Sequence, residues 1–313
     1  MLDKKVKISV VTPCYNEEEN VELLYNKVKE AFSQIGIYDH EHIFIDNSST
    51  DNTVKILKSI ANKDKNLKII VNSRNFGHIR SPFYGLLQGS GEAVIFLASD
   101  FQDPPEMIKD FLLKWKEGYK IVLGVKKQSK ESRLMFALRK VFYDLIGAIS
   151  EIDHIKHFTG FGLYDKRIIQ ILRNIDDPYP YFRGLVCDIG FEIFTIEFVQ
   201  PVRKKGVTKN NFYSLYDMAM LGITNHSKVP LRLATMLGFL AALASFFVAI
   251  VYFIYKIIFW QNFTVGTAPI VIGVFFFSAV QLFFIGILGE YIGSIHTQVL
   301  KRPLVIEKER INF

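Results

Sequence analysis

The segment of this chain with the clearest chemical signal combines carboxylate and amide side chains with a pair of prolines. It follows the apolar run 93–98, which predicts a buried strand, and it reads Ser99-Asp100-Phe101-Gln102-Asp103-Pro104-Pro105-Glu106. Asp100 and Gln102 are two positions apart, so in an extended segment both side chains point the same way. Hard oxygen ligands at the carboxyl end of a strand suit a divalent cation that carries phosphate. We therefore predict a metal site at Asp100 and Gln102, and we expect Asp103 to cap the helix that follows.

Three other polar segments also follow runs that predict strands. The first, Pro13-Cys14-Tyr15-Asn16-Glu17, combines an aromatic face with hydrogen-bonding groups, as a nucleoside requires. The second begins with Asp46, a candidate for reading a base edge, and ends with Asp51, which is expected to cap the next helix. The third, Arg74-Asn75-Phe76-Gly77-His78, offers a cation and an amide. Because ligands of parallel sheets bind beyond the carboxyl ends of the strands, we expect all four segments to converge on one crevice.

The elements that must position these segments alternate between strands and helices. The predicted strands cover 7–12, 42–46, 67–71, 93–98 and 120–125. The predicted helices that follow the second, third and fourth strands cover 51–61, 81–88 and 104–116. Asn16 is expected to cap the first helix, with Glu19 completing a capping box. Alternation of this kind predicts an α/β fold with parallel strands and right-handed crossovers.

The carboxyl-terminal part of the chain has a different composition. No charged residue lies between Arg232 and Lys256, or between Lys256 and Glu290. Each gap exceeds the roughly 20 apolar residues that span a bilayer core, so 233–255 and 269–295 predict two transmembrane helices. The alternative is a pair of buried helices in a soluble protein. Lysines and arginines flank both spans, whereas the connection 260–267 has none, and this asymmetry predicts that both termini are cytoplasmic.

The overall composition indicates in which compartment the protein lies and which partners it binds. The net charge of +7 is concentrated beside the apolar spans, which favours attraction to anionic lipid headgroups over binding of nucleic acid. Two cysteines, Cys14 and Cys187, make no disulfide framework and fit a reducing compartment. The amino terminus passes directly into a predicted strand, so we expect no cleaved signal peptide. Two amphipathic stretches, 133–149 and 212–224, either lie in the membrane interface or pack on the sheet.

Taken together, the motifs resemble the family 2 glycosyltransferases with the GT-A fold, and among them the polyprenyl-phosphate glycosyltransferases. That group includes dolichyl-phosphate mannose synthases and bactoprenol glucosyltransferases. The resemblance extends over nearly the whole chain, from the segments at 10–17, 74–77 and 100–106 through Arg183-Gly184, Gly206-Val207-Thr208-Lys209, Pro230-Leu231-Arg232, Gly289-Glu290-Tyr291-Ile292-Gly293 and Lys301-Arg302-Pro303. Each motif alone is weak, but their order ahead of and within two apolar spans is specific.

The resemblance implies an α/β fold: a GT-A (Rossmann-like) nucleotide-sugar-binding domain followed by two transmembrane helices. We expect a cytoplasmic glycosyltransferase domain over 1–210, a juxtamembrane interfacial region over 211–232, a transmembrane hairpin over 233–295 and a cytoplasmic tail over 296–313. The chain would then be a multi-pass protein of the inner (plasma) membrane.

The resemblance also implies roles for single residues. Asp100 and Gln102 would hold Mg²⁺ or Mn²⁺ on the diphosphate of a nucleotide sugar. The donor would be bound by Pro13, Tyr15, Glu17, Asp46, Arg74 and Asn75. The lipid phosphate of the acceptor would face Arg203 and Lys209, joined by Arg183.

Two positions depart from the family pattern. An acidic residue usually stands two positions before Asp100, where this chain has Ala98. The family also tends to have an Asp before a Phe-Arg-Leu-like segment, and the corresponding stretch 159–165 has none at that point. Asp188 either compensates as a catalytic carboxylate or is a surface or capping residue. A base is not required, because a lipid phosphate monoester is already anionic near neutral pH, with a second pKa of about 6.

The sequence therefore predicts a metal-dependent, inverting transfer of a sugar from a nucleotide sugar, a UDP-sugar, to undecaprenyl phosphate at the cytoplasmic membrane face. A polysaccharide-synthase-like enzyme is one alternative, although such enzymes use more spans and a Gln-x-x-Arg-Trp motif that is not found in this sequence. A non-catalytic membrane scaffold is the other, and Ala98 favours it. Assembly into a homo-oligomer stays open.

Overall fold

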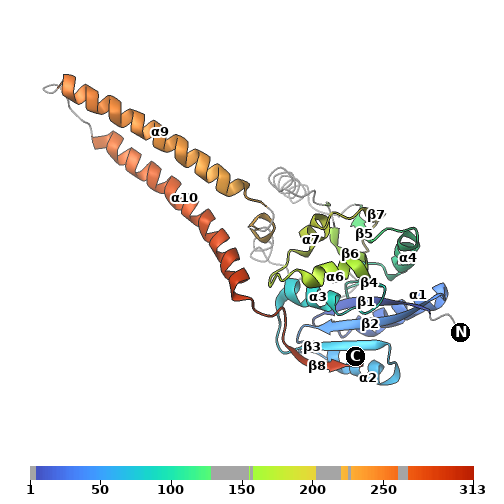
Figure 1. The fold of residues 1–313 in the computed structure, drawn as a ribbon. Coiled ribbons are helices and arrows are strands. Elements are labelled where there is room, and N and C mark those ends of the chain that lie inside the picture. Colours follow the sequence, from blue (N-terminus) through green and yellow to red (C-terminus); the bar gives the residue numbers. More distant parts are fainter. Residues whose placement is uncertain (1–4, 128–154, 156–157, 202–219, 225–226, 260–266) are drawn as a thin grey trace.

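Strands and helices alternate through the amino-terminal part of the computed structural model, which describes residues 5–127, 155, 158–201, 220–224, 227–259 and 267–313. The described strands form one sheet with helices on both faces, and two long helices extend from it as a hairpin (Figure 1). The strands are β1 (Val6–Cys14), β2 (Tyr38–Asp46), β3 (Leu67–Asn72), β4 (Ala93–Phe96), β5 (Ile121–Lys126), β6 (Phe158–Asp165), β7 (Ile193–Phe198) and β8 (Glu307–Ile311). The helices are α1 (Val21–Ile35), α2 (Thr53–Lys63), α3 (Gly77–Leu87), α4 (Ile108–Lys116), α6 (Lys166–Asn174), α7 (Phe182–Asp188), α9 (Val229–Ile258) and α10 (Thr267–Leu300), with a 3₁₀ turn, η1 (Pro105–Met107), before α4.

The strand order across the sheet is β7-β5-β6-β4-β1-β2-β3-β8. β1 pairs in parallel with β2 and β4, and β2 pairs in parallel with β3, as the alternating pattern predicts. The fifth predicted strand, β5, runs in the same direction as these four but does not pair with them, because β6, which the sequence does not predict, lies between β4 and β5 and runs antiparallel to both. Gly162 permits the close approach of β6 to β5, since a Cβ atom at this position would lie 2.5 Å from the carbonyl oxygen of Val122.

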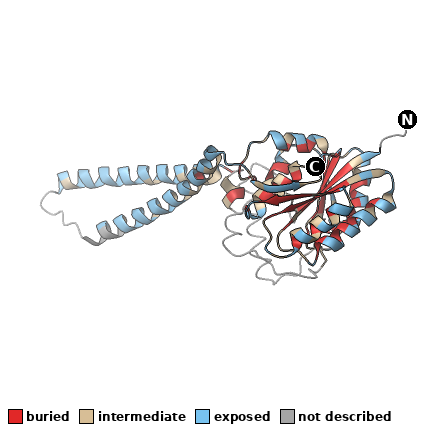
Figure 2. Ribbon diagram, turned by 90° about the horizontal axis from the view of Figure 1, so that it is seen from below, coloured by how far each residue is buried: buried red, intermediate tan, exposed pale blue. Residues whose placement is uncertain are grey.

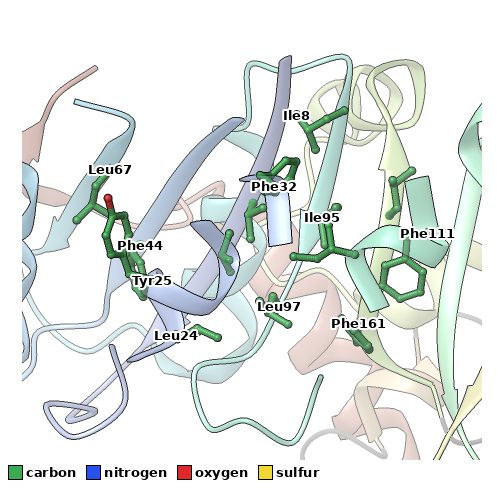
Figure 3. Packing of buried hydrophobic residues seen from close by; sticks show 14 of the residues in the cluster. Ile8, Leu24, Tyr25, Phe32, Phe44, Leu67, Ile95, Leu97, Phe111 and Phe161 are labelled. Atoms are coloured by element: carbon green, nitrogen blue, oxygen red, sulfur yellow. The ribbon is translucent and has the colours of Figure 1, made fainter. Parts of the chain in front are cut away.

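The core lies on both faces of this sheet because successive strand residues point to opposite sides. Val10 packs in the cluster beneath α1, α2 and α4, together with Phe44 and Phe111 (Figure 3). Val11 belongs to the cluster on the other face, where Phe83 of α3 and Ile169 of α6 also lie. The helices therefore hold the sheet rigidly, and the loops at its edges are free to carry chemistry.

The first helix begins later than the sequence predicts. α1 starts at Val21 with Asn20 at its N-cap, and no side chain caps it, so the predicted capping box of Asn16 and Glu19 is wrong. Asn16 instead adopts a left-handed conformation with φ 55°, and its Oδ1 accepts a hydrogen bond from the Thr50 N–H at 2.8 Å. Asn16 thus joins two loops instead of starting a helix.

The carboxyl-terminal segment returns to the sheet as its edge strand. β8 pairs antiparallel with β3, with Ile311 opposite Ile69 (Figure 1). The Tyr84 hydroxyl of α3 donates to Glu307 at 2.8 Å, and Arg310 donates to Gln88 at 2.8 Å. The prediction of a separate tail over 296–313 therefore misses this strand. Both ends of the helical hairpin are joined to one domain.

The hairpin contains the two predicted apolar spans. The helical stretches Val229–Ile258 and Gly273–Leu300 are long and apolar enough to cross a membrane, and the apolar window of each is 0% buried. In Figure 2 the hairpin is almost entirely exposed, whereas the centre of the sheet is buried. The alternative of two buried helices in a soluble core is therefore wrong.

Several sequence predictions concern residues outside the described ranges. These are the amphipathic stretch 133–149, most of 212–224, and the two acceptor candidates Arg203 and Lys209. Only the end of the second stretch is described, and residues 220–224 are helical there.

Candidate active site

Four loops leave the carboxyl ends of β1, β2, β3 and β4, which are adjacent parallel strands. They are the loops 15–20, 47–52, 73–76 and 97–104. Parallel strands end at the same edge of a sheet, so these loops meet where the sequence predicts a crevice. The candidate donor and metal residues from these segments therefore share one edge.

Hydrogen bonds between side chains and backbone hold the first two loops together. The Asn16 N–H donates to the Ser49 hydroxyl at 2.8 Å, and the Glu17 N–H donates to the Thr53 hydroxyl at 2.9 Å. Glu17 in turn accepts from the Asn20 amide at 2.6 Å. Asp51 accepts the Thr53 N–H at 2.9 Å, but the N-cap residue of α2 is Asn52, so Asp51 lies one residue before the predicted cap position. Pro13 near the end of β1, and Tyr15 and Glu17 on the first loop, are partly exposed.

Asp46, the predicted base-reading residue, is fully buried at the end of β2. Its carboxylate accepts hydrogen bonds from both the N–H and the hydroxyl of Ser49. Burial raises the pKa of this carboxyl, while the Ser49 hydrogen bonds oppose the shift. Burial, and then the nearby Asp46 charge, also raises the pKa of the Cys14 thiol well above its usual value. Cys14 is therefore a packed thiol, and Asp46 shapes the loop that follows it.

Asn47 links the second and third loops, a role that the sequence analysis missed. Its Nδ2 donates to Asn75 Oδ1 at 2.9 Å, and its Oδ1 accepts the Phe76 N–H at 2.8 Å. The same oxygen accepts from the buried amide of Asn72 at 3.1 Å. Asparagine can donate and accept at once, which is what a link between two loops requires. The signal for this role in the sequence was the position of Asn47, a polar residue directly after a buried strand.

Two arginines, one on the third loop and one in the first turn of α3, lie over the ring of Phe76. The guanidinium carbon of Arg74 lies 4.1 Å from the centre of the Phe76 ring, and that of Arg80 lies 5.5 Å from it. Arg74 is exposed and also donates to the Asn75 carbonyl at 3.0 Å. The predicted donor residues Arg74 and Asn75 are thus held beside the Asp46 loop through Asn47.

The fourth loop contains the predicted metal ligands. The Gln102 N–H donates to Asp100 Oδ1 at 3.1 Å, and both side chains are partly exposed. Phe101 between them has φ 58°, a left-handed conformation that costs a non-glycine residue energy. The loop is therefore a tight turn and not the extended segment that the spacing argument assumed.

Asp103 does not cap the following helix. The residue before η1 is Pro104, and no side chain caps that turn. Asp103 is instead 5% exposed, and its Oδ2 accepts the Ala98 N–H at 3.3 Å. Burial raises the pKa of Asp103 to about 7. The carboxyl closes its own loop from within, and the prediction of a cap is wrong because the side chain turns back toward β4.

The predicted metal ligands supply only part of the coordination sphere of a divalent cation. No cluster of three or more His, Cys, Asp or Glu side chains that could hold a metal is present in the described part of the chain. One carboxylate, Asp100, and one amide, Gln102, do not make a complete cage. Mg²⁺ in nucleotide sites is typically held by one or two carboxylates together with substrate phosphates and water. The residues thus fit a cation that arrives with its diphosphate.

The predicted acceptor residue Arg183 lies on α7, away from the metal loop in sequence but beside α3. It lines a cavity of about 100 Å³ together with His78, Phe96, Thr159 and Phe182. The Thr159 hydroxyl is buried and has no hydrogen-bond partner among the described residues. Asp188 ends the same helix and is exposed, in agreement with a surface residue.

Sequence comparison gives two family matches that together cover most of the chain. The model of "Glycosyl transferase family 2" matches residues 9–184, and that of the "GtrB C-terminal hairpin" matches residues 229–295. The first match contains all four loops, and the second contains α9 and most of α10.

Relatives of similar length also match. The chain is 32% identical over 306 residues to an uncharacterized glycosyltransferase, YkcC, of Bacillus subtilis (strain 168), covering 97% of this chain and 94% of that protein. It is 33% identical over 305 residues to the SfII prophage-derived bactoprenol glucosyl transferase of Shigella flexneri, covering 97% and 98%. Among solved structures, a mannosyltransferase from Pyrobaculum calidifontis in complex with GDP-Man and Mn²⁺ aligns with a TM-score of 0.48 at 14% identity, over 96% of this chain and 89% of that one.

Proposed function

The chain belongs to glycosyl transferase family 2, and from this premise we propose that it transfers a sugar from a UDP-sugar to a polyprenyl phosphate, undecaprenyl phosphate, at the membrane surface. It is a glycosyltransferase with the GT-A fold. The donor, the acceptor and the metal dependence are the parts that we propose. Relatives named bactoprenol glucosyl transferase support the choice of acceptor.

One structural observation carries the proposal. The loops that present Asp100, Arg74 and Tyr15 lie at one edge of a sheet from which an apolar hairpin also extends. Because β8 follows α10 and pairs with β3, the hairpin leaves the domain and returns to it. A soluble nucleotide and a lipid phosphate could both reach such a domain. A scaffold without turnover would not need these loops on the domain that carries the hairpin, whereas a transferase between two phases does.

The hydrogen bonds between the loops support the donor half of the proposed site. Tyr15 and Glu17 would bind the nucleoside and Arg74 would face the diphosphate, while Asn47 links the second and third loops. Asp100 and Gln102 would hold Mg²⁺ or Mn²⁺, which when bound would neutralise the charge of the leaving diphosphate. Asp46 would act through the Ser49 loop, because its own carboxylate is buried.

The acceptor supplies its own nucleophile. A phosphate monoester carries up to two negative charges near neutral pH, since its second pKa is about 6. One of its oxygens can attack the anomeric carbon directly while the bond to the nucleotide diphosphate breaks. A single displacement of this kind inverts the anomeric centre. Arg183 would then orient the lipid phosphate, together with Arg203 and Lys209, and alignment of this kind is a major source of catalysis.

The same arrangement supports a topology in which the domain and both hairpin ends are cytoplasmic. Lys228 and Arg232 precede the apolar part of α9, and Lys301 and Arg302 follow α10. The connection 260–266 contains no lysine or arginine. Positive residues stay on the cytoplasmic side, so we propose a multi-pass protein of the plasma membrane with the division at about 211–232 predicted above.

The test is a donor panel with a lipid readout. Membranes containing the full-length protein are incubated with polyprenyl phosphate, Mn²⁺ or Mg²⁺, and each of several radiolabelled nucleotide sugars. We expect one UDP-sugar to label the lipid extract, and we expect a chelator to stop the reaction. If no donor yields a lipid-linked sugar with either metal present, the proposed function is wrong. If product forms from a GDP-sugar, the donor assignment alone fails.

A further inference from the structure

Three arginines converge where the hairpin rejoins the sheet domain. Arg80, in the first turn of α3, donates through Nη2 to the carbonyl of Pro303, and this places it beside Arg302. The guanidinium carbons of Arg74 and Arg80 lie 4.1 and 5.5 Å from the centre of the Phe76 ring. We call Arg74, Arg80 and Arg302 the arginine cluster.

The cluster has no acidic counterpart within the described ranges. Neighbouring cations are paired, since Lys301 lies 3.3 Å from Asp176 and Arg310 lies 2.6 Å from Glu307. By contrast, none of the three arginines lies within ion-pair distance of a described carboxylate. Arg80 also keeps a buried Nε that has no hydrogen-bond acceptor. A guanidinium carries five N–H donors, so most of the donors in the cluster are available.

The surroundings add further positive potential. Burial lowers the pKa of Arg80, the charges of Arg74 and Arg302 lower it further, and Tyr179 opposes the shift, so Arg80 is repelled by both of the other arginines. No acidic residue lies in the first turn of α3, where the helix dipole already favours an anion. Uncompensated like charges of this kind are costly unless an anion is shared between them.

The position of the cluster indicates where such an anion comes from. Arg302 follows α10 by two residues and is exposed, and Figure 1 shows the end of α10 arriving beside α3. α10 is one of the two candidate membrane helices, so its end lies at the level of the lipid headgroups in the proposed topology. Phosphate is the anionic group that is concentrated there, and arginine can bind it in a bidentate manner.

We propose that Arg80 and Arg302 bind the phosphate group of an anionic bilayer phospholipid, with Arg74 adding charge from the neighbouring loop. This site is separate from the acceptor, which we assign to Arg183 and the segment that contains Arg203 and Lys209. Lipid binding here would fix the height and tilt of the domain on the membrane. The inference goes beyond the proposed function and does not depend on which sugar is transferred.

The test measures lipid binding directly, without a transfer reaction. The full-length protein in detergent is titrated with phosphatidylglycerol or phosphatidylcholine, and bound lipid is counted by native mass spectrometry. The variants are Arg302→Gln, Arg80→Gln and the charge-conserving Arg302→Lys. The matched control is Lys109→Gln, which removes the same charge from α4, drawn far from α10 in Figure 1. Circular dichroism and the melting temperature show whether each variant is folded.

We expect Arg302→Gln and Arg80→Gln each to weaken phosphatidylglycerol binding about fivefold, the effect of one basic residue at an anionic surface. Phosphatidylcholine binding should not change, Lys109→Gln should bind like the wild type, and Arg302→Lys should keep most of the affinity. Two results would overturn the proposal: folded glutamine variants that bind like the wild type, or an equal loss in Lys109→Gln. Displacement of the lipid by inorganic phosphate would assign the cluster to a soluble anion, and displacement by UDP would assign it to the donor site.

Discussion

In the sheet domain Ile8, Phe44 and Ile95 are fully buried, whereas in α9 Phe246, Phe247 and Phe253 expose 66–68% of their surface. The same apolar residue types thus serve two different surroundings in one chain. In the domain they exclude water from a core between helices and sheet. In the hairpin they face outward, and in the proposed topology a bilayer covers them.

Polar groups show the opposite contrast. The domain buries polar side chains such as Glu41, Asn72 and Asp103 and gives them partners within the protein. The hairpin has no charged side chain between Lys256 and Glu290, and its helices satisfy the backbone by themselves. The domain can therefore hold polar side chains for a reaction at the edge of its sheet. In the proposed topology, the hairpin positions the domain at the membrane surface. Four tests, each with its own control, probe the two regions.

The largest expected effect is on the proposed metal ligand. Asp100→Asn should lower the transfer rate by about 10³-fold or more, because an amide cannot replace the carboxylate that would hold the cation on the diphosphate. The measurement is lipid-linked product formed by the full-length protein with the donor found by the panel. Asp110→Asn, at an exposed position on α4, is the matched control and should retain activity. An active Asp100→Asn variant would remove Asp100 from the proposed site.

The second-largest expected effect is on the stability of the fold. It concerns Glu41, a buried carboxylate with no role in the proposed transfer reaction. Glu41 is 1% exposed and lies 2.6 Å from Lys7 and 2.8 Å from Lys68. Burial alone would raise its pKa, but hydrogen bonds from Lys68, Lys7 and Ser9 lower it to about 2. Glu41→Gln leaves two lysines without their partner and should lower the free energy of unfolding by about 3–5 kcal/mol.

The pH dependence gives an independent readout for the same variant. The pKa of Glu41 is lower in the folded protein than the usual value of 4.5, so the carboxylate stabilises the fold above pH 4.5. This contribution is lost as the pH falls from 4.5 toward 2. Melting temperatures of the wild type should fall in that range more steeply than those of Glu41→Gln. Glu30→Gln, which disrupts an exposed pair with Lys27, should follow the wild type.

The third test makes the same substitution in both regions. Leu243 of α9 and Leu23 of α1 are 50% and 49% exposed. Leu243→Lys should cost about 2.5–3.5 kcal/mol of membrane insertion, since a lysine at the centre of a span is unfavourable. Leu23→Lys should change stability by no more than about 0.5 kcal/mol, as is usual for surface positions. The amount of each variant in the membrane fraction provides the measurement, and equal behaviour would contradict the assignment of α9 to the bilayer.

The parts of this molecule that the sequence predicts are those fixed by local pattern. The uncharged run at 233–255 predicts α9 because its length alone requires a helix in a bilayer. The run 7–12 predicts β1 because its residues favour strands and the residues after it are polar. The four loops at the sheet edge were also correctly placed, since parallel strands order their own carboxyl ends.

The parts that the sequence does not predict depend on contacts between distant residues. β6 enters between β4 and β5, and β8 pairs with β3 from the far end of the chain, because a pairing partner is chosen by the whole sheet. Asp103 has the local pattern of a helix cap, but it turns inward to Ala98. Asn47 resembled any polar residue after a strand, and only the structure shows that it joins two loops.

The smallest effect tests how β8 holds the hairpin to the domain. Tyr84→Phe removes the hydroxyl that donates to Glu307 at 2.8 Å and should cost about 1 kcal/mol, the net value of one hydrogen bond. The control is Tyr119→Phe, because the Tyr119 ring packs 4.9 Å from that of Phe194 while its hydroxyl has no hydrogen bond to any described residue. Chemical unfolding of the full-length protein in detergent measures both. A double-mutant cycle with Glu307→Gln then isolates the pair, and a coupling energy of zero would mean that β8 is held by its backbone pairing with β3 instead of by this side-chain contact.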